Sequence, residues 1–163
     1  CEMRVLFRLF ALVVPVTVIT TASPPSTAAA SAKDTCSLLT QSQLTDAVGT
    51  SMNAGTYVMP VYTRTCTWTL ASGATPAVRS LTLDLKPAEA YEADKKLDAQ
   101  ANATGVPDLG DDAYYVNFSG ISIASLSVKK GDVSFKLTWY GAADSQKIMT
   151  AEKSLASHVL SNL

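Results

Sequence analysis

The sequence has few of the residues that catalytic and metal-binding sites use most. It contains one histidine, His158, among its 163 residues. A single imidazole excludes zinc sites that are built on several histidines. A triad-type hydrolase would depend on this one side chain as its general base. The sequence also lacks a glycine-rich phosphate loop, and no cofactor is predicted.

The chain has no marked excess of charge of either sign. Its 13 basic and 14 acidic residues give a formal net charge of -1 at pH 7. Domains that bind nucleic acid carry a basic patch or stripe, so we predict no nucleic-acid partner. The same balance gives no electrostatic attraction to an anionic membrane surface.

No apolar run is long enough to span a membrane, which takes about 20 residues. The longest, residues 9–19, follows two arginines and precedes a stretch of small and polar residues. This order is typical of a secretory signal, and the sequence ASA at 30–32 predicts cleavage before Lys33. We therefore predict a cleaved export signal at 1–32 and a secreted or extracytoplasmic mature chain without a stable membrane span. An uncleaved anchor is the alternative.

The chain has only three cysteines. Cys1 stands ahead of Met3 and is either an artefact of the gene start or a lipid-carrying residue. Cys36 and Cys66 remain in the predicted mature chain, where export permits disulfides and only one pairing exists. A bond between them closes a loop of about 30 residues, which the chain-entropy model values at roughly 3–4 kcal/mol. Two free redox-active thiols are the alternative, although the spacing is far from that of a CxxC motif.

A short capped helix is predicted after Leu39. Thr40 is a good N-cap, and Gln43 three residues later completes a capping box. Leu39 and Leu44 form a hydrophobic staple, and Gly49 supplies a left-handed stop. A helix of about eight residues is not stable alone, so it needs the core and the cysteine bond beside it.

Alternating apolar and polar residues predict strands in the rest of the chain. Two of them, 64–70 and 80–85, are expected to form a hairpin, and 57–59 could add an edge strand. Short turns join three more strands into an antiparallel meander, with one helix before it and one after it. The meander strands are 113–118, 121–129 and 133–139, and the helices are 88–102 and 145–163.

This order of elements favours an α+β fold with a single antiparallel sheet of five or six strands. The helices are expected to pack mainly on one face of the sheet, with the first and last on the same face. Residues 33–163 are enough for one domain of ordinary size, so we predict a single α+β domain over this range.

Three tyrosines form the candidate binding surface. Tyr114 and Tyr115 are adjacent in a predicted strand, so one faces outward if the other faces the core. Tyr140 alternates with Trp139 in the same way. Exposed aromatic side chains are enriched where proteins bind partners. The alternative is that tyrosine simply suits strands.

Three carboxylates, Asp108, Asp111 and Asp112, gather in a predicted turn. Carboxylates at this density could bind calcium. Their spacing is not that of an EF-hand loop, and turns favour aspartate for backbone reasons alone. No other metal site is predicted.

Several short runs together resemble a known family. CSLLT at 36–40, the helix end at 48–49 and CTW at 66–68 occur with LGDDAY at 109–114 and VKKGD at 128–132. They resemble a family of small secreted or lipid-anchored actinobacterial cell-envelope domains of unknown function. More distantly, the chain is similar to the extracellular sensor domain of a mycobacterial receptor kinase. The resemblance implies an α+β envelope domain without established catalysis, although Cys36 lacks the context of a lipidation signal.

The sequence therefore favours a secreted or cell-envelope domain that is not an enzyme and that binds a ligand or an envelope partner. No catalytic residue is assigned. Two alternatives stay open: a small secreted hydrolase that uses His158 or an acidic pair, and a purely structural envelope protein.

Overall fold

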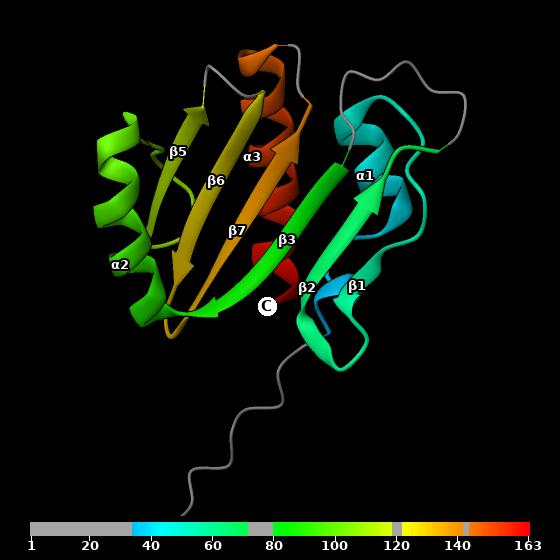
Figure 1. Cartoon of the computed structure of the whole chain (residues 1–163), viewed down its shortest axis with the longest axis horizontal. Helices are drawn as coiled ribbons and strands as arrows, with labels where there is room; N and C mark the ends of the chain where they lie inside the picture. Colours follow the sequence, from blue (N-terminus) through cyan, green and yellow to red (C-terminus); the bar gives the residue numbers. More distant parts are fainter. Residues whose placement is uncertain (1–33, 72–79, 119–121, 142–143) are drawn as a thin grey trace, which may run out of the picture. The chain divides into compact units, whose positions relative to one another are not determined.

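The computed structural model describes residues 34–71, 80–118, 122–141 and 144–163 (Figure 1). They belong to one compact unit, Ser31–Leu163. The predicted export signal at 1–32, its cleavage site and Cys1 lie outside the described residues.

The described strands form one antiparallel sheet in the order β1-β2-β3-β7-β6-β5-β4. They are β1 (Thr56–Met59), β2 (Tyr62–Thr69), β3 (Ser80–Pro87), β4 (Thr104–Gly105), β5 (Asp112–Phe118), β6 (Ile123–Lys130) and β7 (Val133–Tyr140). The predicted α+β class, the β2–β3 hairpin and the β5–β6–β7 meander are confirmed.

The strand number differs from the prediction, because the sheet has seven strands rather than five or six. The additional strand is β4, in which Thr104 pairs with Tyr115 and Gly105 with Tyr114. Two residues are too few to leave a readable alternation, so the sequence pattern indicated only a loop there.

The helical elements are η1 (Thr35–Ser37), α1 (Gln41–Val48), α2 (Ala88–Asp98), η2 (Ala99–Ala101) and α3 (Ser145–Asn162). Leu44 of α1 and Leu155 of α3 share the main core with Tyr115 of β5. Tyr91 of α2 packs instead on Tyr114, the strand neighbour that points to the opposite face. The first and last helices therefore cover one face, as predicted, and α2 lies on the other.

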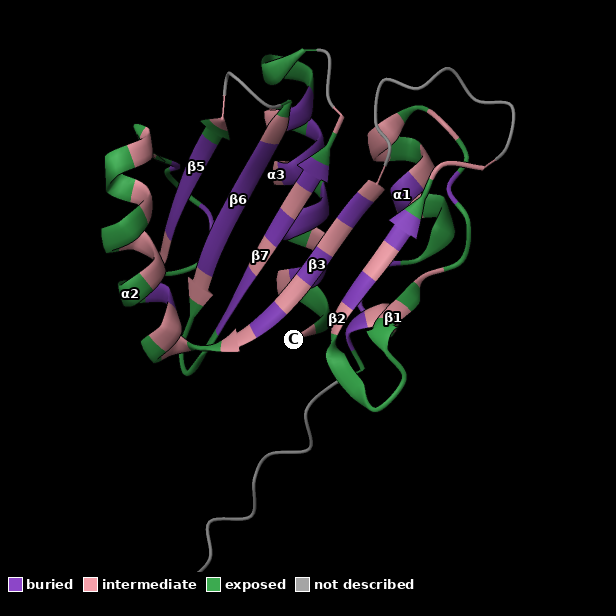
Figure 2. Ribbon diagram, viewed as in Figure 1, coloured by how far each residue is buried: buried purple, intermediate pink, exposed green. Residues whose placement is uncertain are grey.

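The main core follows from the alternation along the central strands, which Figure 2 shows as largely buried. Every second side chain on each strand points to the same face of the sheet, where it packs against side chains of the neighbouring strands. Its members from β2, β3, β6 and β7 are Cys66, Trp68, Leu81, Leu83, Leu85, Ala124, Leu126, Val128, Phe135, Leu137 and Trp139.

Helix α1 has the caps that its sequence predicts. The Gln43 side chain accepts a hydrogen bond from the Thr40 backbone N–H at 2.9 Å, and the Thr40 hydroxyl accepts one from the Gln43 N–H at 3.3 Å. Gly49 ends the helix with φ at +73°, a conformation that glycine adopts without strain. Leu39 and Leu44, the predicted hydrophobic staple, are both buried in the main core.

A disulfide joins Cys36 and Cys66 and so ties η1 to β2, as predicted. The chain passes closely over this bond at Gly55, where an added Cβ would lie 2.6 Å from the Cys66 Sγ and 2.6 Å from the Trp68 Nε1. Only glycine fits between the disulfide and the indole at this point. The bond therefore anchors the segment before α1 and the loop after it.

Candidate functional site

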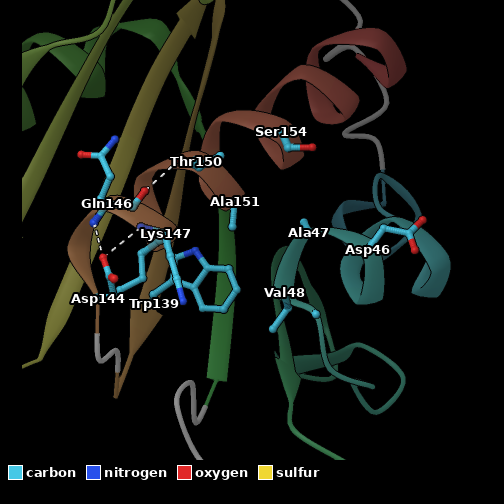
Figure 3. Close-up of a pocket in the computed structure, with 12 residues that line it drawn as sticks. Asp46, Ala47, Val48, Trp139, Asp144, Gln146, Lys147, Thr150, Ala151 and Ser154 are labelled. Atoms are coloured by element: carbon cyan, nitrogen blue, oxygen red, sulfur yellow. Dashed lines mark hydrogen bonds between the residues drawn. The ribbon is translucent and has the colours of Figure 1, made fainter.

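A pocket of about 620 Å³ lies between the end of α1 and the first half of α3 (Figure 3). Ala47 and Val48 of α1 line one side, Ile148 and Ala151 of α3 line the other, and Trp139 of β7 lies between the two helices. Pockets that hold small molecules are typically about 300–1,000 Å³ and mostly apolar. The size and the lining are therefore those of a small-molecule site.

The α1 side of the pocket is held by local interactions. The capping box fixes where the helix begins and Gly49 fixes where it ends, so its last turn is placed against the pocket. The Gln41 side chain donates a hydrogen bond of 2.6 Å to the Met52 carbonyl, which joins the first turn to the following loop. This wall is thus formed by a helix of two turns with both ends secured.

The α3 side begins at a second strong cap. The Asp144 carboxylate accepts hydrogen bonds from the backbone N–H groups of Gln146 at 3.0 Å and Lys147 at 3.2 Å. An aspartate at this position stabilises a helix start by satisfying free N–H groups. Ile148 and Ala151 follow on the buried face of the helix. The Asp144 carboxylate therefore serves as the N-cap of α3.

The polar groups of the pocket are mainly at its rim, where Lys147 is exposed and has no ion pair within the described residues. The indole Nε1 of Trp139 is buried and has no hydrogen-bond partner there either. An unmade hydrogen bond to a buried donor costs stability. The lining residues include neither histidine nor cysteine in the described part of the chain. The arrangement suits binding of an apolar molecule that carries an acceptor.

One carboxylate is buried beneath α3. Glu152 is fully covered, and neither of its carboxyl oxygens makes a hydrogen bond within the described ranges. Burial raises the pKa of Glu152 well above its ordinary value, and the nearby backbone N–H of Leu126 only partly offsets this. Glu152 in turn raises the pKa of Tyr115, although burial of that phenol is the larger cause and brings its pKa to about 12. The carboxyl is held in its neutral form over an extended pH range.

The three predicted tyrosines do not form one surface. Tyr114 is 1% exposed and donates a hydrogen bond to Asp98 of α2 at 2.9 Å. Tyr115 is 7% exposed beneath α3, where its hydroxyl donates to the Ser145 carbonyl at 3.4 Å. Only Tyr140, at 40%, is exposed. The expectation of a surface patch is wrong for Tyr114 and Tyr115, because a helix covers each face of β5.

Two of the three predicted calcium carboxylates, Asp111 and Asp112, are held by other groups, and Asp108 is exposed. Asp111 accepts from the Gly131 N–H at 2.6 Å and from Lys130 at 3.2 Å, and these partners lower its pKa. Asp112 pairs with Lys95 of α2 at 2.5 Å, which lowers its pKa. No group of three potential metal ligands comes together within the ranges that the structure describes. The calcium interpretation is therefore not supported.

The remaining predicted candidate, His158, lies half-buried on α3 and does not line the pocket. The pocket itself was missed from the sequence. Its walls come from residues near 47 and near 148, and no local pattern indicates that they meet. The one available signal was Trp139, which the alternation of β7 placed in the core without showing that it borders a cavity.

No family model matches this chain, and no curated protein matches it either.

In the described part of the chain, none of the helices combines the length and the apolar character that crossing a membrane requires.

Proposed function

We propose that this protein is an exported, non-catalytic domain that binds a small, largely apolar ligand in the pocket between α1 and α3. The observation that carries the proposal is the pocket of about 620 Å³ with apolar walls and Trp139 between them. Both walls are fixed by helix caps, and a site whose walls are already ordered loses little entropy on binding.

The chemistry of the lining narrows the class of ligand. An apolar body would contact Val48, Ile148 and the Trp139 ring. A hydrogen-bond acceptor would complement the exposed ammonium group of Lys147 at the rim, where the carboxylates of Asp46 and Asp144 also lie. We therefore propose an amphiphilic ligand with an apolar body and a head that accepts hydrogen bonds.

The Cys36–Cys66 disulfide supports a location outside the cytoplasm, since such bonds persist in oxidising compartments. The apolar run at 9–19, which follows two arginines, also supports export from the cytoplasm. The resemblance to cell-envelope domains implies the same location. We propose the cell envelope or the extracellular medium as the place where the ligand is met.

Titration with anilinonaphthalene sulfonate tests the pocket. This probe has a fused aromatic body and an anionic head, and its fluorescence rises in apolar surroundings. We expect saturable binding of one probe to each chain. Ser154→Phe places a large ring at the exposed edge of the pocket and should weaken probe binding about tenfold, which corresponds to about 1.4 kcal/mol.

The matched control is Ser157→Phe, which places the same ring on the exposed side of α3 outside the pocket lining. It should leave probe affinity unchanged. Circular dichroism and a cooperative thermal transition confirm that both variants are folded. Equal affinity of the two variants, or a signal that does not saturate, would show that the pocket is not the binding site.

A further inference from the structure

The turn between β1 and β2 carries an unusual concentration of exposed apolar side chains. We call Val58, Met59, Val61 and Tyr62 the hairpin tip. The described residues hold seven exposed large hydrophobic side chains, and these four lie within five consecutive positions. Val61 is 95% exposed. Figure 2 shows the turn as continuously exposed at one end of the sheet. Scattered exposed apolar residues are ordinary, whereas a contiguous group indicates a contact surface.

The sequence around the hairpin tip is uncharged. No acidic or basic residue occurs between Asp46 and Arg64. Exposed edge hairpins usually carry lysine or other charges that prevent association. Here Pro60 is the one such feature in the turn. Transfer of the hairpin tip from water to apolar surroundings is therefore favourable, and no charged side chain in the turn opposes it.

We infer that the hairpin tip enters the boundary between the head groups and acyl chains of a lipid bilayer. The tip is convex and small, and a bilayer accepts a convex apolar group without needing a matching cavity. A stable protein interface buries about 800 Å² on each partner, which four side chains at one turn do not supply. Tyrosine at the base of an aliphatic tip suits the interfacial region, where amphipathic rings are enriched.

The first described residues lie beside the hairpin, at the end of the domain that we propose faces the bilayer. Asp34 is the first described residue, and its carboxylate accepts a hydrogen bond from the Tyr57 hydroxyl of β1. The disulfide at Cys36 then fixes this segment to β2. The described chain therefore begins beside the base of the hairpin, which is the end of the domain that an uncleaved N-terminal anchor, the alternative to a cleaved signal, would be attached to.

The contact is apolar, since a net charge of -1 gives no general attraction to lipid head groups. It should therefore be detectable on uncharged vesicles and should not depend on salt. This separates it from binding through basic residues, which needs anionic lipid. It is also independent of the pocket, which lies between other elements.

Tryptophan fluorescence of the full chain tests the inference directly. Both native tryptophans, Trp68 and Trp139, are buried, so a tryptophan placed at residue 61 reports on the tip. On adding phosphatidylcholine vesicles, Val61→Trp should show a blue shift in emission, and spin-labelled phospholipid should quench it. Leu97→Trp is the matched control, because Leu97 is 67% exposed on α2, away from the hairpin. Its emission should not change.

A second pair of variants tests whether the indole introduced by Val61→Trp itself causes the vesicle binding. Val61→Asp should lower the vesicle partition coefficient of the full chain about tenfold or more, and Leu97→Asp should leave it as in the wild type. Unchanged Val61→Trp emission with vesicles would overturn the inference. So would a blue shift that needs no vesicles and grows with protein concentration, because the tip would then contact a second copy of the chain.

Discussion

At the scale of single residues, Glu152 is an ionisable side chain that is buried in the core without a hydrogen-bond partner in the described part of the chain. It occupies the apolar face of α3 beside Leu155 and Val159, and it is fully buried. Tyr115 faces it from β5, and the backbone of Leu126 approaches it from β6. Burying an unpaired carboxylate is costly, so the group keeps its proton instead.

Glu152 should make the protein less stable as the pH rises. Its pKa in the folded state lies above the ordinary value of 4.5. The contribution of Glu152 to stability is therefore most favourable below about pH 4.5, and it falls as the pH rises toward the folded-state pKa by up to about 1.4 kcal/mol per pH unit. Glu152→Gln removes this loss, so urea denaturation at pH 7 should find the variant more stable than the wild type.

The comparison at low pH gives the sign of the effect. Near pH 4 the wild-type carboxyl is largely neutral in both states, so most of the advantage of Glu152→Gln should disappear there. Glu89→Gln changes an exposed glutamate of α2 and should not reproduce the pH-dependent gain. A Glu152→Gln variant with an undiminished gain at pH 4 would contradict the burial argument.

The tyrosines show how far residue-level reasoning reaches. Alternation correctly places Tyr114 and Tyr115 on opposite faces of β5. It does not indicate what lies above each face. Tyr114 is covered because α2 crosses back over the sheet, and Lys136 joins Tyr114 in contacting Asp98 of that helix. Burial depends on this distant contact, which a strand's own pattern does not contain.

At the scale of elements, α1 is short and depends on its caps. Thr40→Ala removes the hydroxyl that accepts the Gln43 N–H, and loss of an N-cap of this kind typically costs about 1 kcal/mol. We expect a loss of this size in chemical denaturation. Because α1 forms one wall of the pocket, binding of anilinonaphthalene sulfonate should weaken as well.

Ser42→Ala is the matched control for the cap. Ser42 lies on the exposed side of the same helix, and its hydroxyl makes only a long contact of 3.4 Å to Asp46. Alanine is also a good helix former. Stability should therefore stay close to that of the wild type. Equal losses for Thr40→Ala and Ser42→Ala would mean that the capping box does not hold α1.

Most elements could be predicted because their signals are local. Thr40, Gln43 and Gly49 identify α1 within ten residues, and short turns identify the meander. β4 and the pocket could not be predicted, because they exist through contacts between distant segments. Thr104 is a strand residue only because Tyr115 pairs with it. The same holds for the pocket, whose two walls are about 100 residues apart in the chain.

At the scale of the whole molecule, contacts with distant parts of the chain hold the segment before α1. The disulfide fixes Cys36 to β2, and the Asn162 side chain near the end of α3 donates a hydrogen bond of 2.9 Å to the Leu38 carbonyl. Elements from both ends of the domain therefore converge on the few residues that lead into α1. The pocket depends on this convergence, since α1 and α3 are its walls.

Loss of the disulfide should therefore affect both stability and binding. Replacing Cys36 and Cys66 together with serine should lower the free energy of unfolding by roughly 3–4 kcal/mol, because the unfolded chain is no longer closed into a loop of about 30 residues. The pocket should lose affinity for anilinonaphthalene sulfonate even where the variant is still folded, since the lead into α1 is held by fewer links.

The native bond is checked first by mass, which should rise by the mass of two hydrogen atoms when a reductant converts the disulfide to two thiols. Reduced wild type then serves as the control for the double variant, because it keeps both sulfur atoms in the core and breaks only the bond. If reduction lowers stability and probe affinity as the serine variant does, the link itself is responsible. If only the serine variant is weakened, the cause is the polar hydroxyl at the fully buried position of Cys66. In that case the η1–β2 connection is not what holds the pocket wall in place.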